Sequence, residues 1–405
     1  MPSSSSRRAA RVPHAVESLP QTKQFVRAAN VGTGVKDAVP FVDLTHTTER
    51  VRDEVLAGLE NLLAANTFAN GPQVAEFESE FAAWCGAPYC VGVASGLDAL
   101  RLGLLAAGVG PGDEVVVPAL TFIATFEAVT QAGAKPVVAD VQASDYNLDP
   151  AAATDALTER TACVLPVHLY GQMADMRVIQ QLAAVKGLLV LEDACQAHGA
   201  MRDGLRAGAA GDMAAFSFYP SKNLGAMGDA GALTTADEER AMRVRALRQH
   251  GETSAYRSEL RGYTARLDTI QALVLLCKLR HLPEWNAQRA RAAAFYSREL
   301  AGVGDLRLPP TPGGSSPVWH LYVVRTGNPD ELAAFLRSRG ITTARHYPQL
   351  PHLSLAYADL GLAEGAFPVA EAIAREALSL PLFPGISETQ LARVCEATRA
   401  FFGDG

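Results

Sequence analysis

The sequence lacks a long hydrophobic run and a surplus of basic residues. No apolar segment approaches the roughly 20 residues that a membrane-spanning helix needs, so we expect no membrane span. The formal net charge is −7. A general nucleic-acid binder needs a basic surface to displace counterions, so this charge argues against nucleic acid as a partner.

Cysteine is sparse and shows no metal-binding pattern. The chain has six cysteines, and no second pair or histidine cluster completes a zinc site around Cys85 and Cys90. Most of the six lie inside apolar runs. We therefore expect buried, reduced thiols in a cytoplasmic protein, and no bound metal.

The first 40 residues lack the apolar central region that a secretory signal needs, and they contain few aromatic residues. They are rich in serine, arginine and proline. Residues 1–40 are therefore expected to form a disordered tail. The length of 405 residues favours two domains after it, a large one over 41–280 and a smaller one over 281–405.

After this tail, short apolar runs rich in valine and leucine alternate with helical patterns. This alternation predicts a mainly parallel sheet in a layered α/β domain. The candidate strands are 89–95, 114–119, 135–141, 163–169, 188–194, 214–219 and 231–236. Beyond about residue 270, a long helical stretch leads to a second unit. Its candidate elements are strands over 319–325 and 341–347, a helix over 330–340 and a closing helix.

Polar and turn-forming residues follow the ends of several candidate strands. They include Gly96, His168, Asp193 and Lys222, and the aromatic residue Phe122 follows another strand end. In an open α/β sheet, ligands bind at the carboxyl ends of the strands. We therefore expect a functional cleft at this edge of the sheet.

Three of these features could hold parts of one ligand. A helix that begins at Gly96 exposes free N–H groups suited to a phosphate. Asp193 follows a buried strand, where a carboxylate needs a cationic or N–H partner. Lys222 lies in the glycine-rich string "SFYPSKNLGAMGDAG", where a lowered pKa would let its amine form a Schiff base. Taken singly, each has an ordinary alternative: a strand-to-helix turn, a helix cap and a solvated surface lysine. Together they describe the anchors of pyridoxal phosphate.

Several strings resemble the sugar-nucleotide aminotransferases of the DegT/DnrJ/StrS type. They are "GVASGLDALRLGL", "GPGDEVVVPALTFIAT", "PVHLYGQMADM", "EDACQAHGA", "AFSFYPSKNLGAMGDAGAL" and "RLDTIQA". The resemblance runs from about residue 41 to the C-terminus. It implies a pyridoxal-phosphate-dependent transferase of fold type I, with a seven-stranded large domain and a smaller C-terminal α/β domain.

The resemblance also implies roles for individual residues. Lys222 would bind the cofactor covalently and later move a proton, while Asp193 would pair with the pyridinium nitrogen. Gln196 would meet the cofactor's phenolic oxygen. The remaining cofactor contacts would be Phe122 stacking on the ring, Gly96, Leu97 and Ser217 at the phosphate, and Arg266 from the partner of a homodimer.

The sequence departs from the family pattern at three positions. Leu97 stands where many members have threonine, Thr264 where they have asparagine, and Ala230 where they have glycine. None of these changes removes a group that the chemistry requires. One branch of the family has histidine in place of the lysine and acts as a dehydratase, so Lys222 places this chain with the transaminating members.

The activity implied by the resemblance is transfer of an amino group from L-glutamate to a nucleotide-linked keto-deoxyhexose. C3 of a dTDP-3-keto-6-deoxyhexose is the preferred position. The candidate substrate contacts, each of which could equally be a packing residue, are His168, Tyr170, Gln172, His346 and Tyr347. Amination at C4, an aminocyclitol substrate, a pyridoxal-phosphate lyase or dehydratase, and a non-catalytic regulator stay open as alternatives.

Overall fold

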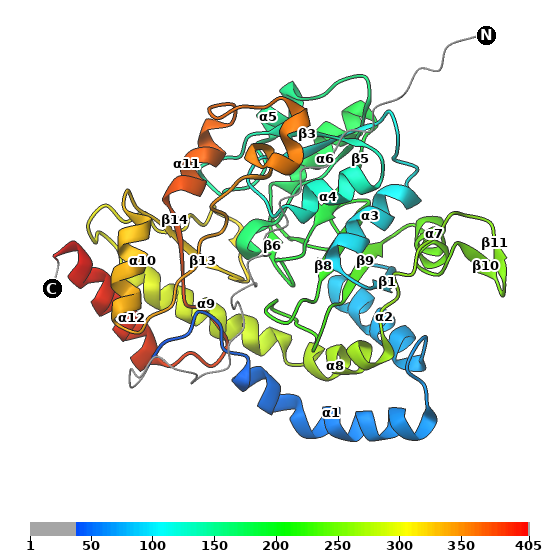
Figure 1. Cartoon of the computed structure of the whole chain (residues 1–405), viewed down its shortest axis with the longest axis horizontal. Helices are drawn as coiled ribbons and strands as arrows, with labels where there is room; N and C mark the ends of the chain where they lie inside the picture. The colour runs from blue at the N-terminus through cyan, green and yellow to red at the C-terminus, as the bar shows by residue number, and fades with distance from the viewer. Residues whose placement is uncertain (1–37, 404–405) are drawn as a thin grey trace, which may run out of the picture.

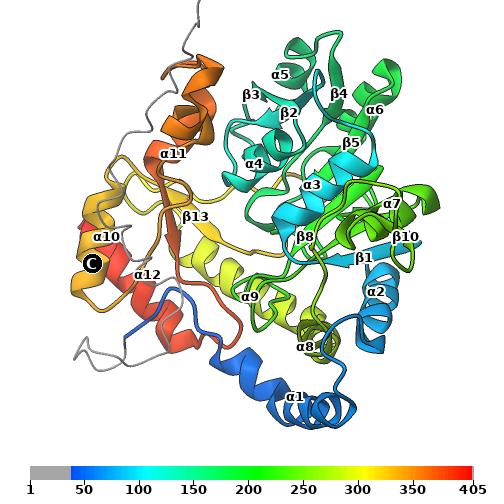
Figure 2. The same ribbon diagram turned by 45° about the vertical axis from the view of Figure 1, so that its right-hand side comes forward.

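A seven-stranded sheet forms the centre of the protein, whose computed structural model describes residues 38–403. Its strands are β1 (Tyr89–Val93), β2 (Glu114–Pro118), β3 (Lys135–Ala139), β4 (Thr161–Val164), β5 (Leu189–Asp193), β8 (Met213–Ser217) and β9 (Gly231–Thr235). Their order across the sheet is β1-β9-β8-β5-β4-β2-β3 (Figures 1 and 2). β9 is antiparallel to both neighbours, and every other neighbouring pair is parallel. The mainly parallel seven-stranded sheet predicted from the sequence is confirmed.

Helices cover both faces of this sheet because each strand alternates its side chains between them. In β2, Val115 and Val117 join one buried cluster with α3 (Gly96–Ala106), α4 (Ala124–Gln131) and α7 (Glu238–Arg248). Val116, between them, joins the cluster on the opposite face. The helices of that face are α2 (Pro72–Cys85), α5 (Pro150–Asp155), α6 (Met176–Lys186) and α8 (Thr269–Leu279).

β4 is shorter than the strand expected over 163–169. Pro166 lacks an N–H group to continue the ladder, and only Val167 makes a further isolated bridge, to Asp193. The chain then forms the short 3-10 helix η1 (Leu169–Gly171). This break carries residues 168–172 across the carboxyl end of the sheet.

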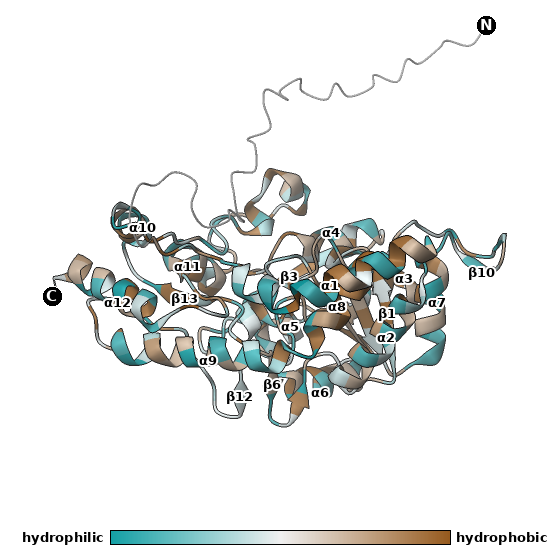
Figure 3. Ribbon diagram, turned by 90° about the horizontal axis from the view of Figure 1, so that it is seen from below, coloured by the Kyte–Doolittle hydropathy of each residue, from teal (hydrophilic) through white to brown (hydrophobic). Residues whose placement is uncertain are grey.

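A third buried cluster joins helices and strands of the C-terminal half. Its elements are α9 (Leu282–Glu299), β13 (Tyr322–Arg325), α10 (Pro329–Ser338), β14 (Ala377–Leu380) and α12 (Glu388–Phe402). α9 directly follows α8 after a break at residues 280–281, so the long helical stretch is two helices. Figure 3 shows α9 and α12 alternating between hydrophilic and hydrophobic residues, as expected for helices with one buried side.

The strand expected over 341–347 is wrong. Residues in this segment make only isolated bridges, from Ile341 to Val39 and from Ala344 to Ser379. β13 pairs instead with β14, whose four residues are all buried. Most of residues 342–347 remain partly exposed, and this segment therefore has no continuous apolar face with which to compete.

The remaining elements complete the described chain. They are α1 (Thr45–Ala65), β6 (Met201–Arg202), β7 (Leu205–Arg206), β10 (Glu252–Ser254), β11 (Arg257–Ser258), β12 (Ser315–Ser316), η2 (Pro351–Leu353), η3 (Leu355–Leu360) and α11 (Pro368–Glu376). The β10–β11 hairpin projects from the body in Figure 1, and Tyr256 at its tip is 99% exposed. Within residues 38–403, no helix has the length and apolar character needed to cross a bilayer.

The expected tail over 1–40 lies outside the described residues except for positions 38–40. There Val39 is fully buried and its N–H donates to the carbonyl oxygen of Gly340 at 2.9 Å. Ordered structure thus includes part of the segment assigned to the tail. The domain division at residue 280 stays a prediction.

Candidate active site

The carboxylate of Asp193 lies at the carboxyl end of β5, in the middle of the sheet. Its Oδ2 accepts a hydrogen bond from the Thr125 hydroxyl at 2.9 Å, and its Oδ1 accepts one from the N–H of Cys195 at 3.2 Å. The Thr121 hydroxyl lies 2.7 Å from that of Thr125. Asp193 is buried and makes no ion pair with a described residue. The site therefore holds a buried negative charge that is hydrogen-bonded but lacks a cationic partner in the described chain.

The N-terminus of α3 lies beside the end of β8. Ser95 caps the helix by accepting from the N–H of Asp98 at 3.0 Å. The first N–H groups of an α-helix have no partner within the helix, so those of Gly96 and Leu97 are available to a ligand. A Cβ at Gly96 would lie 2.7 Å from the Cβ of Ser217. Glycine is thus required for this close approach, which places Ser217 next to the helix end.

Lys222 lies in the loop that follows β8, and the glycines of this loop permit its tight path. A Cβ at Gly225 would lie 2.2 Å from the carbonyl oxygen of Pro220, a distance that no side chain tolerates. Burial lowers the pKa of Lys222 below the ordinary value of 10.5, against the opposing effects of Cys195 and Asp193. Its amine is therefore neutral at a lower pH than that of an exposed lysine.

Lys278 of α8 fixes the far end of the same loop. Its ammonium donates to the carbonyl oxygen of Gly225 at 2.7 Å and is buried without a carboxylate partner among the described residues. Burial lowers the pKa of Lys278 to about 8. The loop is thus held by a lysine whose charged, protonated form is disfavoured by burial.

We expect this cation to make stability depend on pH. The unfolded chain binds more protons than the folded chain between pH 8 and 10.5, because the pKa of Lys278 is about 8 when folded and 10.5 when exposed. Over this window the free energy of unfolding should rise by about 3 kcal/mol more in the wild type than in Lys278→Met. Urea unfolding at several pH values measures it, with the exposed-site variant Lys186→Met as control. Parallel curves for the wild type and Lys278→Met would contradict the expectation.

Gln196 links the sheet edge to the C-terminal half. Its Oε1 accepts from the N–H of Tyr170 at 2.7 Å, which leaves its Nε2 to donate to the hydroxyl of Tyr347 at 2.9 Å. The ring of Tyr347 lies 5.5 Å from that of Phe122, which is 52% exposed. The structure thus brings together Gln196, Phe122 and Tyr347.

His346 and Tyr170 join the same two parts of the chain. The hydroxyl of Tyr170 donates to the carbonyl oxygen of His346. The imidazole of His346 stacks on Phe41 at 5.6 Å, and its Nδ1 lies 2.8 Å from the hydroxyl of Ser379. Burial lowers the pKa of His346 to about 4, so this imidazole is neutral at pH 7.

His168 and Gln172, by contrast, have their polar atoms engaged within the protein. The N–H of Ala174 donates to Nδ1 of His168, so Nε2 carries the proton and donates to Glu192 at 2.8 Å. Gln172 donates to the carbonyl oxygen of Asp145 at 3.2 Å. Both residues are buried. Their role as substrate contacts stays a prediction, and these hydrogen bonds equally fit the packing alternative that the sequence left open.

Arg266 forms an isolated backbone bridge with Val93, the last residue of β1. Its guanidinium donates to Oε1 of Gln249 at 3.1 Å and lies 3.4 Å from Nε2 of His250, as does the hydroxyl of Thr264. Its predicted contact to the cofactor of a partner subunit stays a prediction. Ala230 does not have a positive φ, so its backbone does not require the glycine of other family members.

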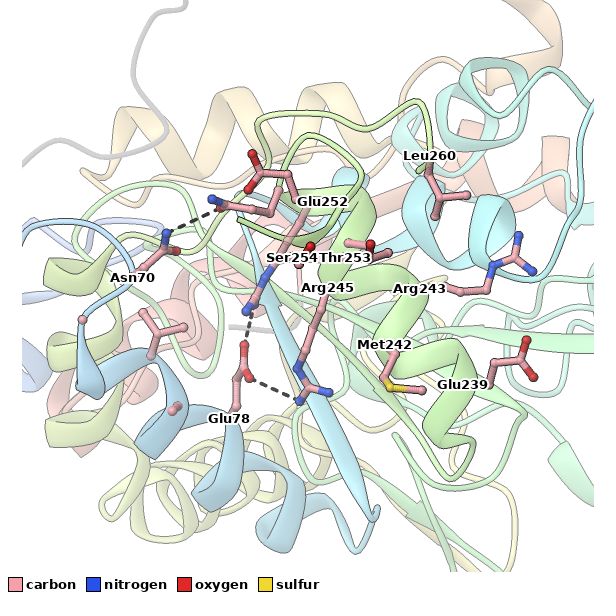
Figure 4. A pocket seen from close by; sticks show the side chains of 16 residues that line it. Asn70, Glu78, Glu239, Met242, Arg243, Arg245, Glu252, Thr253, Ser254 and Leu260 are labelled. Carbon is pink, nitrogen blue, oxygen red and sulfur yellow. Dashed lines mark hydrogen bonds and ion pairs between the residues drawn. The ribbon is translucent and has the colours of Figure 1, made fainter. Parts of the chain in front are cut away.

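An open pocket lies away from Lys222, between α2, α7 and the β10–β11 hairpin (Figure 4). It has a volume of about 680 Å³. One wall carries Glu78, which pairs with Arg248 at 2.5 Å and with Arg245 at 3.4 Å. Neither Lys222 nor Asp193 lines it. This pocket is therefore separate from the residues predicted to bind the cofactor.

Sequence reasoning missed three residues of this region, Thr125, Asn223 and His320. Thr121 and Thr125 are spaced like neighbours on one helix face and follow a strand end, which was an available signal. Asn223 directly follows Lys222, and Asn223 Oδ1 lies 3.2 Å from Nδ1 of His320. No local pattern pointed to His320, because the contact joins residues 97 positions apart.

Known proteins resemble the chain over most of its length. A model of the DegT/DnrJ/EryC1/StrS aminotransferase family matches residues 49–399. The erythromycin biosynthesis sensory transduction protein EryC1 of Saccharopolyspora erythraea is 48% identical, over 89% of this chain and 99% of its own. The dTDP-3-amino-3,4,6-trideoxy-alpha-D-glucose transaminase of Streptomyces venezuelae is 47% identical, over 89% of this chain and 95% of its own.

Solved structures extend the match to the fold. The S. venezuelae protein DesV, crystallised with a ketimine intermediate, has a TM-score of 0.89 and 47% identity, covering 90% of this chain and 99% of its own. NtdA of Bacillus subtilis, solved with bound PMP, has a TM-score of 0.83 and 31% identity, covering 91% and 86%. The fold type, the transaminase class and the dependence on pyridoxal phosphate predicted from the sequence are confirmed. The chain belongs to the DegT/DnrJ/EryC1/StrS aminotransferase family.

Proposed function

We propose that this enzyme transfers an amino group from L-glutamate to C3 of a dTDP-linked keto-deoxyhexose, in the biosynthesis of an amino sugar. The observation that carries the proposal is the 47% identity, over 89% of the chain, to a dTDP-3-amino-3,4,6-trideoxy-alpha-D-glucose transaminase. The cluster formed by Lys222, Asp193 and the N-terminus of α3 supports it, because it supplies the groups that such a reaction requires.

The residues present fit pyridoxal phosphate. Asp193 is a buried carboxylate without a cationic partner among the described residues, as a protonated ring nitrogen would require. The available N–H groups at Gly96 and Leu97 suit a phosphate. Ser217 lies beside them, at a distance that only glycine at position 96 permits.

The proposal assigns each cofactor contact to particular residues. Gly96, Leu97 and Ser217 would hold the phosphate, and Arg266 would reach it from a partner subunit. Phe122 has an exposed face on which the ring can stack. Gln196 directs its Nε2 donor toward Tyr347, beside Phe122, where it would also meet the phenolic oxygen.

The chain's own groups then divide the work of proton transfer. When bound, the cofactor supplies an electron sink for negative charge on the carbon next to nitrogen. Asp193 would hold a proton at the ring nitrogen, and its bond from Thr125 keeps the carboxylate oriented. Lys222 would bind the cofactor and later move a proton between carbon atoms, for which its lowered pKa suits it.

The substrate contacts, the assembly and the location belong to the same proposal. Tyr347 and His346 would meet the sugar, and Tyr170 would hold their segment to the sheet through its bond to His346. We infer a homodimer, and the projecting hairpin with its exposed Tyr256 is a suitable contact between subunits. The six free cysteines suit a reducing, cytoplasmic location.

Two half-reactions test the proposed function. The protein loaded with pyridoxal phosphate should show a visible absorption band that L-glutamate removes and a dTDP-3-keto-6-deoxyhexose restores. With ¹⁵N-labelled glutamate, NMR of the product should place the label at C3 of the sugar. A 4-keto sugar is the matched control and should restore the band far more slowly.

Other outcomes would assign a different function. A band that never responds to glutamate would replace the transaminase proposal with a lyase or dehydratase. Label at C4 would retain the transaminase and overturn the C3 assignment.

A further inference from the structure

Asn223, the residue after Lys222, is buried and uses all of its amide group within the fold. Its Nδ2 donates to the carbonyl oxygen of Val318 at 2.9 Å and to Oδ1 of Asn286 at 2.9 Å. Its Oδ1 lies 3.2 Å from Nδ1 of His320. Asn223 therefore connects the Lys222 loop with α9 and with the segment that leads into β13.

The orientation of both amide groups is fixed by backbone carbonyl oxygens, which can only accept hydrogen bonds. The atom of Asn223 that faces Val318 must be the nitrogen, so its oxygen faces His320. Asn286 is fixed in the same way, because its Nδ2 donates to the carbonyl oxygen of His198 at 2.8 Å. An exchanged oxygen and nitrogen in either amide would bring two acceptors together.

This arrangement decides the tautomer of His320. Since Oδ1 of Asn223 can only accept, Nδ1 of the imidazole must carry the hydrogen. A neutral ring then has its lone pair on Nε2. Burial lowers the pKa of His320 well below 6.5, and the positive charges of Lys222 and Arg289 act in the same direction. The imidazole is therefore neutral at pH 7.

Nε2 of His320 has no hydrogen-bond partner in the described part of the chain. The two ring nitrogens of His198 are fully buried without a partner, whereas Nε2 of His320 retains some solvent exposure. Arg289 holds the backbone of this segment, because its guanidinium donates to the carbonyl oxygens of Trp319 and His320 at 3.3 Å. His320 is thus a rigidly held acceptor, in contact with the residue that directly follows Lys222, and its Nε2 is left for a ligand.

We propose that His320 accepts a hydrogen bond from a hydroxyl group of the sugar substrate through Nε2, and that Asn223 is the positioning residue that fixes the required tautomer. The inference rests on the proposed function, in which Lys222 is the reactive amine. The sugar offers hydroxyl donors to this acceptor, whereas the only donor of glutamate is its α-ammonium group, the group that reacts with the cofactor.

The tautomer is measured first, on the cofactor-free protein, by NMR with ¹⁵N-labelled histidine. The wild type should show a fixed Nδ1–H imidazole that does not titrate between pH 6 and 8, assigned by its loss in His320→Gln. In Asn223→Ala the ¹⁵N chemical shifts of the two ring nitrogens should move toward the average of both tautomers. Asn286→Ala is the matched control, since the bond to Val318 still orients Asn223 and the tautomer should persist.

Kinetics of the two half-reactions provide the second measurement. His320→Leu should raise the KM of the keto sugar about tenfold, the effect of one lost hydrogen bond, and leave the rate with L-glutamate unchanged. His320→Gln can present an amide oxygen and should recover part of the loss.

Several outcomes would overturn the inference. They are an Nε2–H or titrating imidazole in the wild type, an unchanged tautomer in Asn223→Ala, and equal losses in both half-reactions. If glutamate never changes the absorption band, the proposed function fails independently of the tautomer, which is measured without cofactor.

Discussion

Replacing Lys222 with alanine should remove the visible band of the lysine-bound cofactor and lower the rate of both half-reactions by about 10⁴-fold. Two functions are lost together, because the same amine binds the cofactor and moves the proton. The amine is suited to both, since burial lowers its pKa below 10.5. Absorption spectra and single-turnover rates with L-glutamate measure the effect.

Two controls separate this loss from a disturbance of the loop. Lys222→Arg retains a cation at the position but cannot act as a neutral amine at pH 7, so it should also lack the band. Lys278→Met alters the hydrogen bond at the other end of the loop and should retain the band. A variant at Lys222 that keeps the band and the glutamate reaction would move the proposed role to another lysine.

Replacing Asp193 with asparagine should lower the glutamate half-reaction by about 10²–10³-fold while the cofactor still binds Lys222. The substitution keeps the shape of the side chain but removes the negative charge that holds a proton at the ring nitrogen. The buried position makes this loss large, because no solvent replaces the missing charge. Stopped-flow absorbance with L-glutamate gives the rate.

The neighbours of Asp193 provide matched controls. Thr125→Val keeps the charge and removes one hydrogen bond, so the rate should fall about tenfold. Glu192→Gln changes the adjacent carboxylate, which accepts from backbone N–H groups at Gly208, Ala210 and Gly211 and should affect stability more than rate. Equal rates for Asp193→Asn and Thr125→Val would contradict a role for the charge.

The C-terminal half shows where prediction from the sequence failed. The sequence predicted a strand over 341–347, yet the strand that pairs with β13 is β14. Its four residues are buried, whereas residues 342–347 are mostly half exposed. The choice depends on which segment can bury its side chains against α10 and α12, which no local pattern records.

The sequence by itself determined the sheet and the reactive groups of this protein. Buried strands such as β2 read as continuous valine runs because both faces are covered, and Asp193 and Lys222 stand directly after strand ends. Only the tertiary structure decided which groups surround them. Gln196 meets Tyr347 across 151 positions, and Asn223 meets His320 across 97. The physical reason is that each of these hydrogen bonds needs a donor and an acceptor whose orientation is fixed by neighbouring backbone carbonyl and N–H groups. Folding alone brings such groups together from distant parts of the sequence.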